Sequence, residues 1–382
     1  AEYGHLYWVM KEIAQAPDLA LQVVVTAAHL VNEFGLTWQR IEADGFEIAA
    51  RVEMLLGSDT PVGVAKSMGV GLIGFAETFA RLKPDLIVVL GDRFELLSIC
   101  QAAVHAGIPI AHIHGGEITE GLIDEAVRHS VSKMSHLHFT AAEPYRRRVI
   151  QMGENPERVF NVGAPGLDHL TKTPRLSREE WQEATGFRLG EVNLLVTYHP
   201  VTLESRYPGE PFSELLQALD GFPQARIIFT KANADTQGRI INRMIDDHVA
   251  RQPERCGAFT SLGTKLYFSA LPLMDAVVGN SSSGLIEVPF FKIPTINLGD
   301  RQKGRLKAAS VIDCQESRAD ITRAIKKTLS ADFRRTLASV TSPYGVGEAA
   351  RRIVEIIQAT PLKSLTEKSF YAPKEWGDGE GG

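Results

Sequence analysis

Short apolar runs alternate with longer amphipathic runs along almost the whole of this chain. Residues 85–90, 108–113 and 192–198 are mainly apolar and include several β-branched side chains. Between such runs lie segments such as 95–106 and 123–134, in which apolar residues recur at the spacing of a helix. Strands that are apolar on both faces and separated by helices are typical of parallel sheets covered on both sides. The pattern therefore predicts an α/β fold.

The alternation continues on either side of residues 163–175, a stretch rich in Gly, Pro and Thr that we interpret as a linker. Ser177 is placed to cap the next helix, because Glu179 stands in its first turn. The other predicted elements are strands at 21–27, 137–140, 159–162, 225–230, 276–278 and 294–298, and helices at 6–13, 143–152, 176–184, 211–219, 237–251, 285–291, 319–329 and 347–357. We expect two doubly wound, Rossmann-like domains, at 1–165 and 176–345, facing a cleft. Ligands in such sheets bind beyond the carboxyl ends of the strands.

The chain opens directly on a helical pattern at 6–13. No strand and no initiator Met precede it. Because an α/β domain normally begins with a strand, we expect the first strand to lie upstream of Ala1 and to be missing from this sequence.

Composition excludes several classes of protein. The chain has 382 residues, 44% of them hydrophobic, which is enough for two domains with full cores. The net charge of −5 is mild and indicates neither nucleic acid nor an anionic membrane as a partner. No apolar run approaches the roughly 18 residues of a membrane span. Cys100, Cys256 and Cys314 have neither disulfide nor metal spacing, so we expect a cytoplasmic protein.

Residues 277–287, Val-Val-Gly-Asn-Ser-Ser-Ser-Gly-Leu-Ile-Glu, pass from a buried strand through a turn of small residues into a short helix. Such a junction leaves several backbone N–H groups unpaired and pointing one way, which suits a phosphate or diphosphate. The serine hydroxyls add further donors. Glu287, about one turn inside the helix, is placed to accept hydrogen bonds from a sugar diol such as a ribose. The alternative is a capped turn without a ligand.

Polar residues gather where the predicted strands end, in both halves of the chain. Because the carboxyl ends of parallel strands meet at one edge of a sheet, we expect these residues to form a site. The clusters are Thr26 with His29, 91–93, 112–117, 198–199, Lys231 with Asn233, 280–283 and 299–301.

The first half supplies carboxylates. Asp92 follows a buried strand, and Glu117 lies just past a Gly-Gly turn. Asp124 opens a helix, with Arg128 and His129 one turn later. Acids and histidines whose pKa values are pushed apart suit general acid–base catalysis. The structural alternatives are an N-cap at Asp92 and an ordinary Asp124–Arg128 ion pair.

The second half supplies groups for anion and diol binding. Besides the serine turn these are His199, Asn233 and Arg301. A lone His after a strand is often a core residue, but His199 lies in the half with the serine turn, so we expect it to contact ligand. His112 and His114 would point the same way on a strand, but no third metal ligand accompanies them. Neither a Walker A sequence nor a dinucleotide-binding fingerprint is present.

A set of motifs spread along the chain resembles one family. The motifs are Ala-Glu-Tyr-Gly at 1–4, Gly-Asp-Arg-Phe-Glu at 91–95, His-Ile-His-Gly-Gly-Glu at 112–117, Ile-Asp-Glu-Ala-Val-Arg-His at 123–129, Tyr-His-Pro at 198–200, Gly-Asn-Ser-Ser-Ser-Gly-Leu-Ile-Glu-Val at 279–288 and Ile-Asn-Leu-Gly-Asp-Arg-Gln at 296–302. From residue 1 to about residue 357 the chain resembles the hydrolysing UDP-N-acetylglucosamine 2-epimerases of bacterial sialic-acid pathways.

The resemblance implies a glycosyltransferase-B-like fold, in which a final helix, here at 346–360, crosses back to the first domain. It also implies a reaction on a UDP-sugar. UDP leaves by elimination as a base removes the proton from carbon 2, and water then adds to the enzyme-held 2-acetamidoglucal to give free N-acetylmannosamine. No metal, nicotinamide or other cofactor is implied.

The resemblance places carboxylates around the sugar, Ser281 and Ser282 at the diphosphate, Glu287 at the ribose and Arg301 near the nucleotide. It does not decide which acid removes the proton at carbon 2. The candidate catalytic residues are Asp92, Glu117, Asp124 and His114. The residue patterns and the resemblance together give the candidate substrate-binding residues His29, Arg128, His129, His199, Asn233, Asn280, Ser281, Ser282, Glu287 and Arg301.

The chain departs from the family at two places. Relatives usually carry Gly-Thr-Arg before the segment at 1–4, and that Arg, which contacts the diphosphate, is absent here. Some relatives have Glu at the position of His114, so the carboxylate role passes to Glu117 or His114 itself acts as acid and base.

Several alternatives stay open. The substrate is UDP-N-acetylglucosamine or the UDP-2,4-diacetamido-trideoxyhexose of legionaminic-acid pathways. The other activities considered are a non-hydrolysing epimerase, a glycosyltransferase of the same architecture and a non-catalytic UDP-sugar-binding regulator. A homodimer or homotetramer is expected, as for most soluble enzymes.

Overall fold

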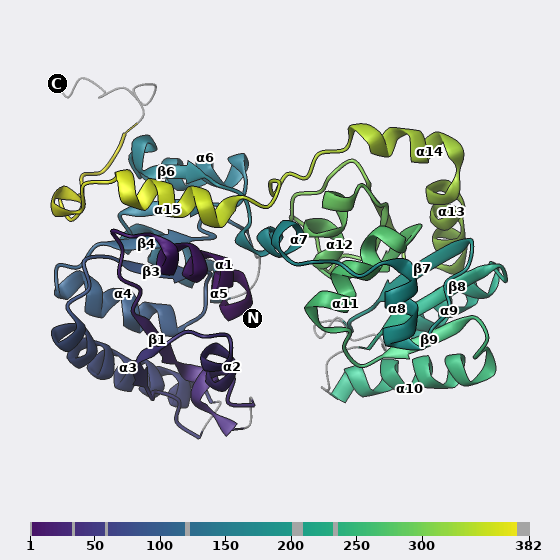
Figure 1. Ribbon diagram of the computed structural model, residues 1–382, viewed down its shortest axis with the longest axis horizontal. Coiled ribbons are helices and arrows are strands. Elements are labelled where there is room, and N and C mark those ends of the chain that lie inside the picture. The colour runs from purple at the N-terminus through teal and green to yellow at the C-terminus, as the bar shows by residue number, and fades with distance from the viewer. Residues whose placement is uncertain are drawn as a thin grey trace, which may run out of the picture. The chain divides into compact units, whose positions relative to one another are not determined.

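The computed structural model describes residues 2–32, 35–57, 60–118, 123–200, 209–231 and 236–372. The chain divides into two compact units (Figure 1). Unit 1 contains Ala1–His169 and Gly347–Gly382, and unit 2 contains Leu170–Val346.

Unit 1 contains two parallel sheets. The larger has the order β3-β4-β5-β6 and the smaller pairs β1 with β2. The strands are β1 (Val23–Thr26), β2 (Ile48–Val52), β3 (Ile87–Leu90), β4 (Ile110–Ile113), β5 (Leu137–Thr140) and β6 (Val159–Asn161). The helices are α1 (Glu2–Gln15), α2 (Trp38–Ala43), α3 (Pro61–Leu82), α4 (Glu95–His105), α5 (Ile123–Met134), α6 (Glu143–Gln151) and α15 (Ala349–Ala359), with α7 (Asp168–Lys172) at the boundary of the units.

Unit 2 contains one six-stranded parallel sheet of order β12-β11-β10-β7-β8-β9. The chain starts in the middle, at β7, moves to one edge and then returns to build the other, which is the doubly wound arrangement. The strands are β7 (Val192–Thr197), β8 (Ala225–Thr230), β9 (Cys256–Phe259), β10 (Ala276–Gly279), β11 (Thr295–Leu298) and β12 (Val311–Cys314). The helices are α8 (Arg178–Thr185), α9 (Gly209–Asp220), α10 (Thr236–Arg251), α11 (Gly263–Ala270), α12 (Ser283–Ile286), α13 (Arg318–Leu329) and α14 (Ala331–Thr336).

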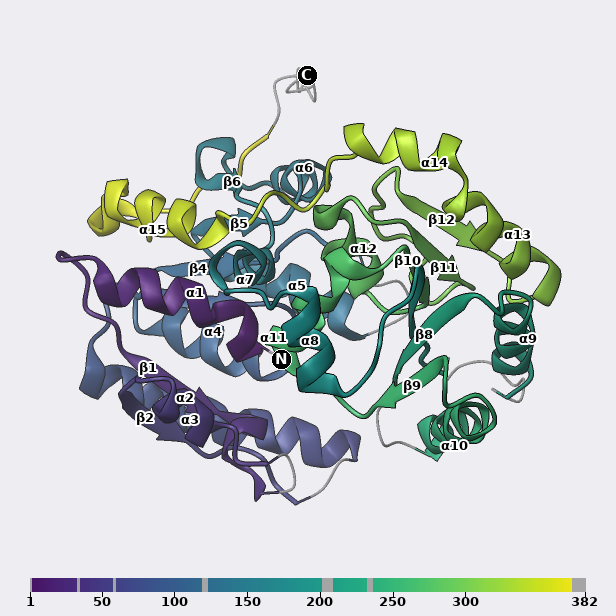
Figure 2. The ribbon, with the colours of Figure 1, turned by 45° about the vertical axis from the view of Figure 1, so that its right-hand side comes forward.

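The larger sheet of unit 1 is covered on both faces. One core joins β3 and β4 to α3, α4 and α5, and the other joins β4 and β5 to α1 and α15, which lie side by side (Figure 2). Asp168, which is fully buried, caps α15: its two carboxylate oxygens accept from the N–H groups of Ala349 at 2.9 Å and Ala350 at 3.0 Å. The helix α15 is thereby fixed in the core of unit 1.

The predicted α/β class and parallel sheets are confirmed, and so is Ser177 as the N-cap of α8, where it forms a capping box with Glu180. Two predictions were wrong in detail. The helix predicted at 285–291 is split into α12 and a 3₁₀ helix at Val288–Phe291, because Pro289 supplies no N–H to continue the ladder. The predicted linker at 163–175 contains a 3₁₀ helix and α7.

The longest helix, α3, was not predicted. Its glycines allow close packing: a Cβ on Gly71 would lie 2.9 Å from Cε of Met54, and one on Gly74 2.8 Å from Cγ1 of Val52. None of the described helices, α3 included, has the length and apolar character needed to cross a membrane.

Candidate active site

Asp92 lies directly after β3, in a turn that a neighbouring strand holds in place. The imidazole Nε2 of His112 on β4 lies 2.8 Å from the carbonyl oxygen of Gly91, and its Nδ1 lies 3.1 Å from Oγ of Ser132. Burial lowers the pKa of His112 to about 3, so the ring is neutral and donates from Nε2 to the carbonyl. The position of Asp92 is thus set by a buried hydrogen-bond chain from β4 and α5.

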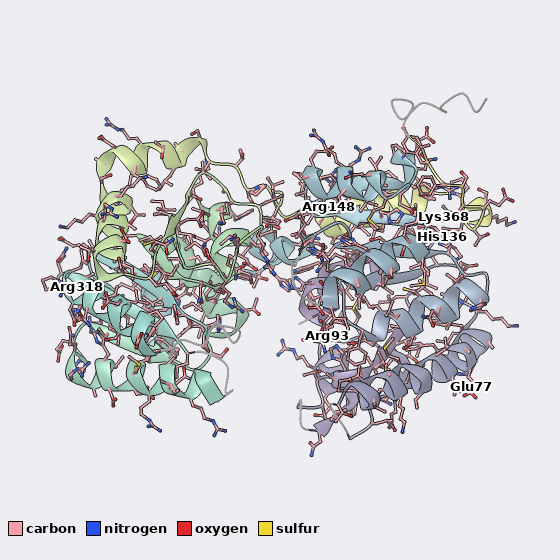
Figure 3. All side chains as sticks on the ribbon, turned by 180° about the vertical axis from the view of Figure 1, so that it is seen from behind. Glu77, Arg93, His136, Arg148, Arg318 and Lys368 are labelled. Carbon is pink, nitrogen blue, oxygen red and sulfur yellow. The ribbon has the colours of Figure 1, made fainter. Side chains whose placement is uncertain are left out.

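The loop after β4 carries His114 and Glu117 and leaves no room for larger residues. His114 has a φ of 67°, in the left-handed region. Gly116 has a φ of 80°, and a Cβ there would lie 2.4 Å from the carbonyl oxygen of Tyr145. Arg148 of α6, labelled in Figure 3, donates to the carbonyl oxygen of Gly116. The loop is therefore rigid where it presents Glu117.

His114 and Glu117 form a hydrogen-bonded pair, with 2.6 Å between Nδ1 and Oε1. The other ring nitrogen, Nε2, is out of contact with solvent and has no hydrogen-bond partner among the described residues. His5 of α1 meets the same ring edge-on, with 6.0 Å between ring centroids, and burial lowers the pKa of His5 to about 4. An imidazole oriented by a carboxylate through one nitrogen, with the other unused, can act as a general acid or base.

Arg128 of α5 supports the carboxylates. Its side chain is 2% exposed, and its guanidinium bonds to the carboxylate of Asp92, to Oε2 of Glu125 at 2.8 Å and to the carbonyl oxygen of Glu117 at 2.9 Å. These bonds give Arg128 a positioning role, and the substrate contact predicted for it stays a prediction. Glu125, which the prediction of an Asp124–Arg128 pair did not include, also bonds to His129 at 3.0 Å.

Two other predicted residues of unit 1, Asp124 and His29, lie on a helix and on a 3₁₀ helix. Asp124 lies in the first turn of α5 and is half-buried. His29, in a 3₁₀ helix after β1, has its Nδ1 2.7 Å from Oγ1 of Thr37.

In unit 2 the serine turn follows β10 at a point that only glycine fits. Gly279 has a φ of 143°, and a Cβ there would lie 1.8 Å from the carbonyl oxygen of Thr197. Asn280 is fully buried, and its amide bonds to both backbone groups of His199, with its Oδ1 accepting at 2.7 Å and its Nδ2 donating at 2.8 Å. Arg301 donates to the carbonyl oxygen of Asn280 at 3.0 Å. Asn280 therefore joins two strand ends, and the substrate contact predicted for it stays a prediction.

The turn itself offers donors. Within the described part of the chain, the backbone N–H groups of Ser281 and Ser282 have no acceptor, and both side chains are half-buried. Glu287 follows α12, and burial raises the pKa of its carboxyl group. The predicted contact at Asn233 lies outside the described residues. No group of three or more acidic, Cys or His side chains in the described ranges is arranged to hold a metal ion.

The sequence profile of UDP-N-acetylglucosamine 2-epimerases matches residues 11–358. A GDP/UDP-N,N'-diacetylbacillosamine 2-epimerase (hydrolyzing) of Campylobacter jejuni is 38% identical over 371 residues, 97% of this chain and 96% of that protein. Polysialic acid biosynthesis protein P7 of Escherichia coli is 36% identical over 97% of this chain and 95% of its own length. The Legionella pneumophila UDP-N,N'-diacetylbacillosamine 2-epimerase (hydrolyzing) is 34% identical over 95% of this chain and 94% of its own.

The crystal structure of UDP-GlcNAc 2-epimerase from Neisseria meningitidis bound to UDP-GlcNAc shares the fold, with a TM-score of 0.76 at 16% identity over 94% of this chain and 97% of that one. The molecule is thus an α/β protein of two Rossmann-like units of the glycosyltransferase-B-like kind. The chain belongs to the UDP-N-acetylglucosamine 2-epimerase family.

Proposed function

We propose that this protein is a hydrolysing 2-epimerase that converts a UDP-2-acetamido sugar and water into UDP and the free sugar inverted at carbon 2. The observation that carries the proposal is the hydrogen-bonded His114–Glu117 pair. The buried Arg128 holds this pair near Asp92, because its guanidinium bonds both to the Asp92 carboxylate and to the carbonyl oxygen of Glu117. The similarity of the protein to hydrolysing epimerases, which extends over almost its full length, supports the same chemistry.

The reaction needs two proton transfers at carbon 2, on opposite faces of the ring. A base removes the proton, the electron pair forms the C1–C2 double bond, and the bond from carbon 1 to the diphosphate oxygen breaks, so UDP carries away the electrons. In hydration an acid delivers a proton to the other face of carbon 2. The water oxygen then bonds to carbon 1, and the water gives up one of its two protons to a base of the enzyme, so the free sugar carries a hydroxyl at carbon 1. We infer that Asp92 and the His114–Glu117 pair divide these two steps between them.

Unit 2 has the complementary role in the proposal. The unpaired amides of Ser281 and Ser282 bind the diphosphate, Glu287 accepts from the ribose, and His199 and Arg301 line the nucleotide site. These groups bind substrate and UDP alike and are fixed mainly through backbone bonds, so they supply uniform binding rather than proton transfer.

For the substrate we propose UDP-N,N'-diacetylbacillosamine ahead of UDP-N-acetylglucosamine. The relatives from Campylobacter jejuni and Legionella pneumophila, at 38% and 34% identity, both carry the diacetamido sugar in their names. The E. coli relative, at 36% identity, is named for polysialic acid and not for the diacetamido sugar. The two sugars therefore have to be compared directly.

The test incubates the full-length protein with each UDP-sugar in deuterium oxide. We expect free UDP, one deuterium at carbon 2 of the released sugar and a higher kcat/KM for the diacetamido substrate. An epimerised sugar still attached to UDP would identify a non-hydrolysing epimerase instead. UDP release that requires an acceptor and leaves carbon 2 unlabelled would identify a glycosyltransferase.

A further inference from the structure

A hydroxyl chain in unit 2 leads from α11 to the carboxylate of Glu287. The phenolic oxygen of Tyr267 lies 2.6 Å from Oγ of Ser283, which begins α12. Burial and the nearby charge of Glu287 raise the pKa of Tyr267, so its hydroxyl keeps its proton and can donate. The sequence gives no sign of this contact, because the two residues belong to different elements.

Hydrogen-bond donation along these hydroxyls has a preferred direction. A serine hydroxyl has one proton and can accept from a second donor. When Tyr267 donates to Ser283, the serine proton is available to Glu287. The Ser283 hydroxyl works against the burial that raises the pKa of Glu287, as a donor to that carboxylate does. Either hydroxyl can donate in the Tyr267–Ser283 bond, but an ionised Glu287 carboxylate only accepts, so ionisation of Glu287 favours donation from tyrosine to serine to carboxylate.

The two hydroxyls leave one oxygen of the Glu287 carboxylate without a donor. Oε2 of Glu287 is out of contact with solvent and has no hydrogen-bond partner among the described residues. A buried acceptor without a donor is costly, so such an atom in a native site calls for an explanation. A ligand hydroxyl that donates to Oε2 would supply the missing bond.

We propose that Tyr267 and Ser283 are positioning residues that hold Glu287 with Oε2 presented to a hydroxyl of the nucleotide ribose, so that the site selects ribonucleotides over deoxyribonucleotides. The inference rests on the proposed function, since it takes a nucleoside diphosphate as the ligand. It also divides the serines of the turn: the proton of Ser283 is committed to Glu287, which leaves Ser281 and Ser282 for the diphosphate.

The test measures the dissociation constants of UDP, 2′-deoxy-UDP and 3′-deoxy-UDP by calorimetry. For the native protein we expect UDP to bind about tenfold or more tightly than the weaker of the two deoxynucleotides, the scale of a hydrogen bond to a charged group. Tyr267→Phe and Ser283→Ala are expected to reduce this ratio by about three- to tenfold through weaker UDP binding, with deoxynucleotide binding within about twofold of native.

Tyr344→Phe is the matched control. Its hydroxyl donates to the carbonyl oxygen of Leu306 at 3.1 Å, also in unit 2, and its removal is expected to leave the ratio unchanged. A Tyr267→Phe variant that weakens all three ligands equally would show a merely structural role and overturn the inference, as would an unchanged ratio. A native protein that binds none of the three nucleotides would overturn the proposed function itself.

Discussion

Each unit contains a glutamate with a buried carboxylate oxygen, and the pKa values of these two glutamates are shifted in opposite directions. Glu154 in unit 1 is 2% exposed and bonds to Lys133 at 2.5 Å, Lys368 at 2.7 Å and His138 at 3.0 Å. Burial alone would raise the pKa of Glu154, but these partners lower it to about 2. Glu287 in unit 2 has no cationic partner among the described residues, and burial raises the pKa of its carboxyl group while the Ser283 hydroxyl lowers it.

This difference in partners indicates that Glu154 serves the stability of the fold and that Glu287 serves ligand binding. A buried carboxylate surrounded by cations is fully compensated and holds elements together, here β5, α5 and the segment of Lys368, which lies beside His136 in Figure 3. A carboxylate with an unused oxygen lowers stability until a ligand arrives. Asp92 lies between these cases, because Arg128 compensates it while its side chain stays 30% exposed. Substitutions at these groups should therefore separate folding, turnover and binding.

The largest effect is expected for the acids of unit 1. Asp92→Asn and Glu117→Gln should each lower kcat by about 10²- to 10⁴-fold, the usual contribution of a general acid or base. UDP affinity should change little, because the groups proposed to bind the nucleotide lie in unit 2. Steady-state kinetics and UDP calorimetry on each variant check this. Native turnover in either variant would remove that acid from the mechanism.

Arg128→Met should cost stability as well as turnover. It leaves two carboxylates without their buried partner, and breaking a buried ion pair costs about 3 kcal/mol or more of the free energy of unfolding. Urea unfolding measures the loss. Arg147→Met, which removes an exposed pair with Glu143, is the control and should cost less than about 1 kcal/mol. Equal losses in the two variants would deny Arg128 its supporting role.

The sequence predicted elements well where local pattern decides them and failed where distant packing does. The helix at 123–134 and the strand at 137–140 have the predicted bounds, because their apolar residues repeat regularly. The helix α3 was missed, because its glycines make sense only against Met54 and Val52 on another segment.

The candidate site divides in the same way. The sequence singled out three carboxylates because each belongs to a polar cluster near the end of a predicted strand: Asp92, Glu117 and Glu287. Their side-chain type indicated acid–base or hydroxyl-binding roles. The residues that hold them were not predicted: Arg148 reaches Gly116 from 32 positions away, and Tyr267 reaches Ser283 from 16. Such partners leave no mark in local sequence, because the fold alone brings them together.

Lowering the pH should remove the contribution of Glu154 to the free energy of unfolding. Because the folded-state pKa, about 2, lies below the ordinary value of 4.5, the stabilisation is complete above pH 4.5 and is lost as the pH falls toward 2. Glu154→Gln should therefore be clearly less stable than native protein at pH 7, and the difference should shrink below pH 4.5. Unfolding curves across this range test it, with Glu143→Gln as an exposed control. A difference that is constant with pH would mean that charge is not the cause.

A smaller effect is expected at the serine turn. Ser282→Ala should weaken UDP binding by about 1–2 kcal/mol through the loss of a donor to a charged ligand, with kcat nearly unchanged. Calorimetry and saturation kinetics measure the two quantities. A fall in kcat with unchanged UDP affinity would place Ser282 among the groups that act on the transition state and would weaken the division of roles between the units.

The smallest effect is expected at Glu287, with the opposite sign to that at Glu154. Because the folded-state pKa is raised above 4.5, the unfolded chain ionises first as the pH rises, and ionisation of Glu287 then works against folding. Without ligand, Glu287→Gln should match native protein at pH 4 and exceed it at pH 8 by at most about 1 kcal/mol, the scale of single stabilising substitutions. Saturating UDP should reverse the order, because the native protein binds it more tightly. If the variant is less stable at both pH values without UDP, Glu287 is a structural acceptor, and the contrast between the two glutamates is lost.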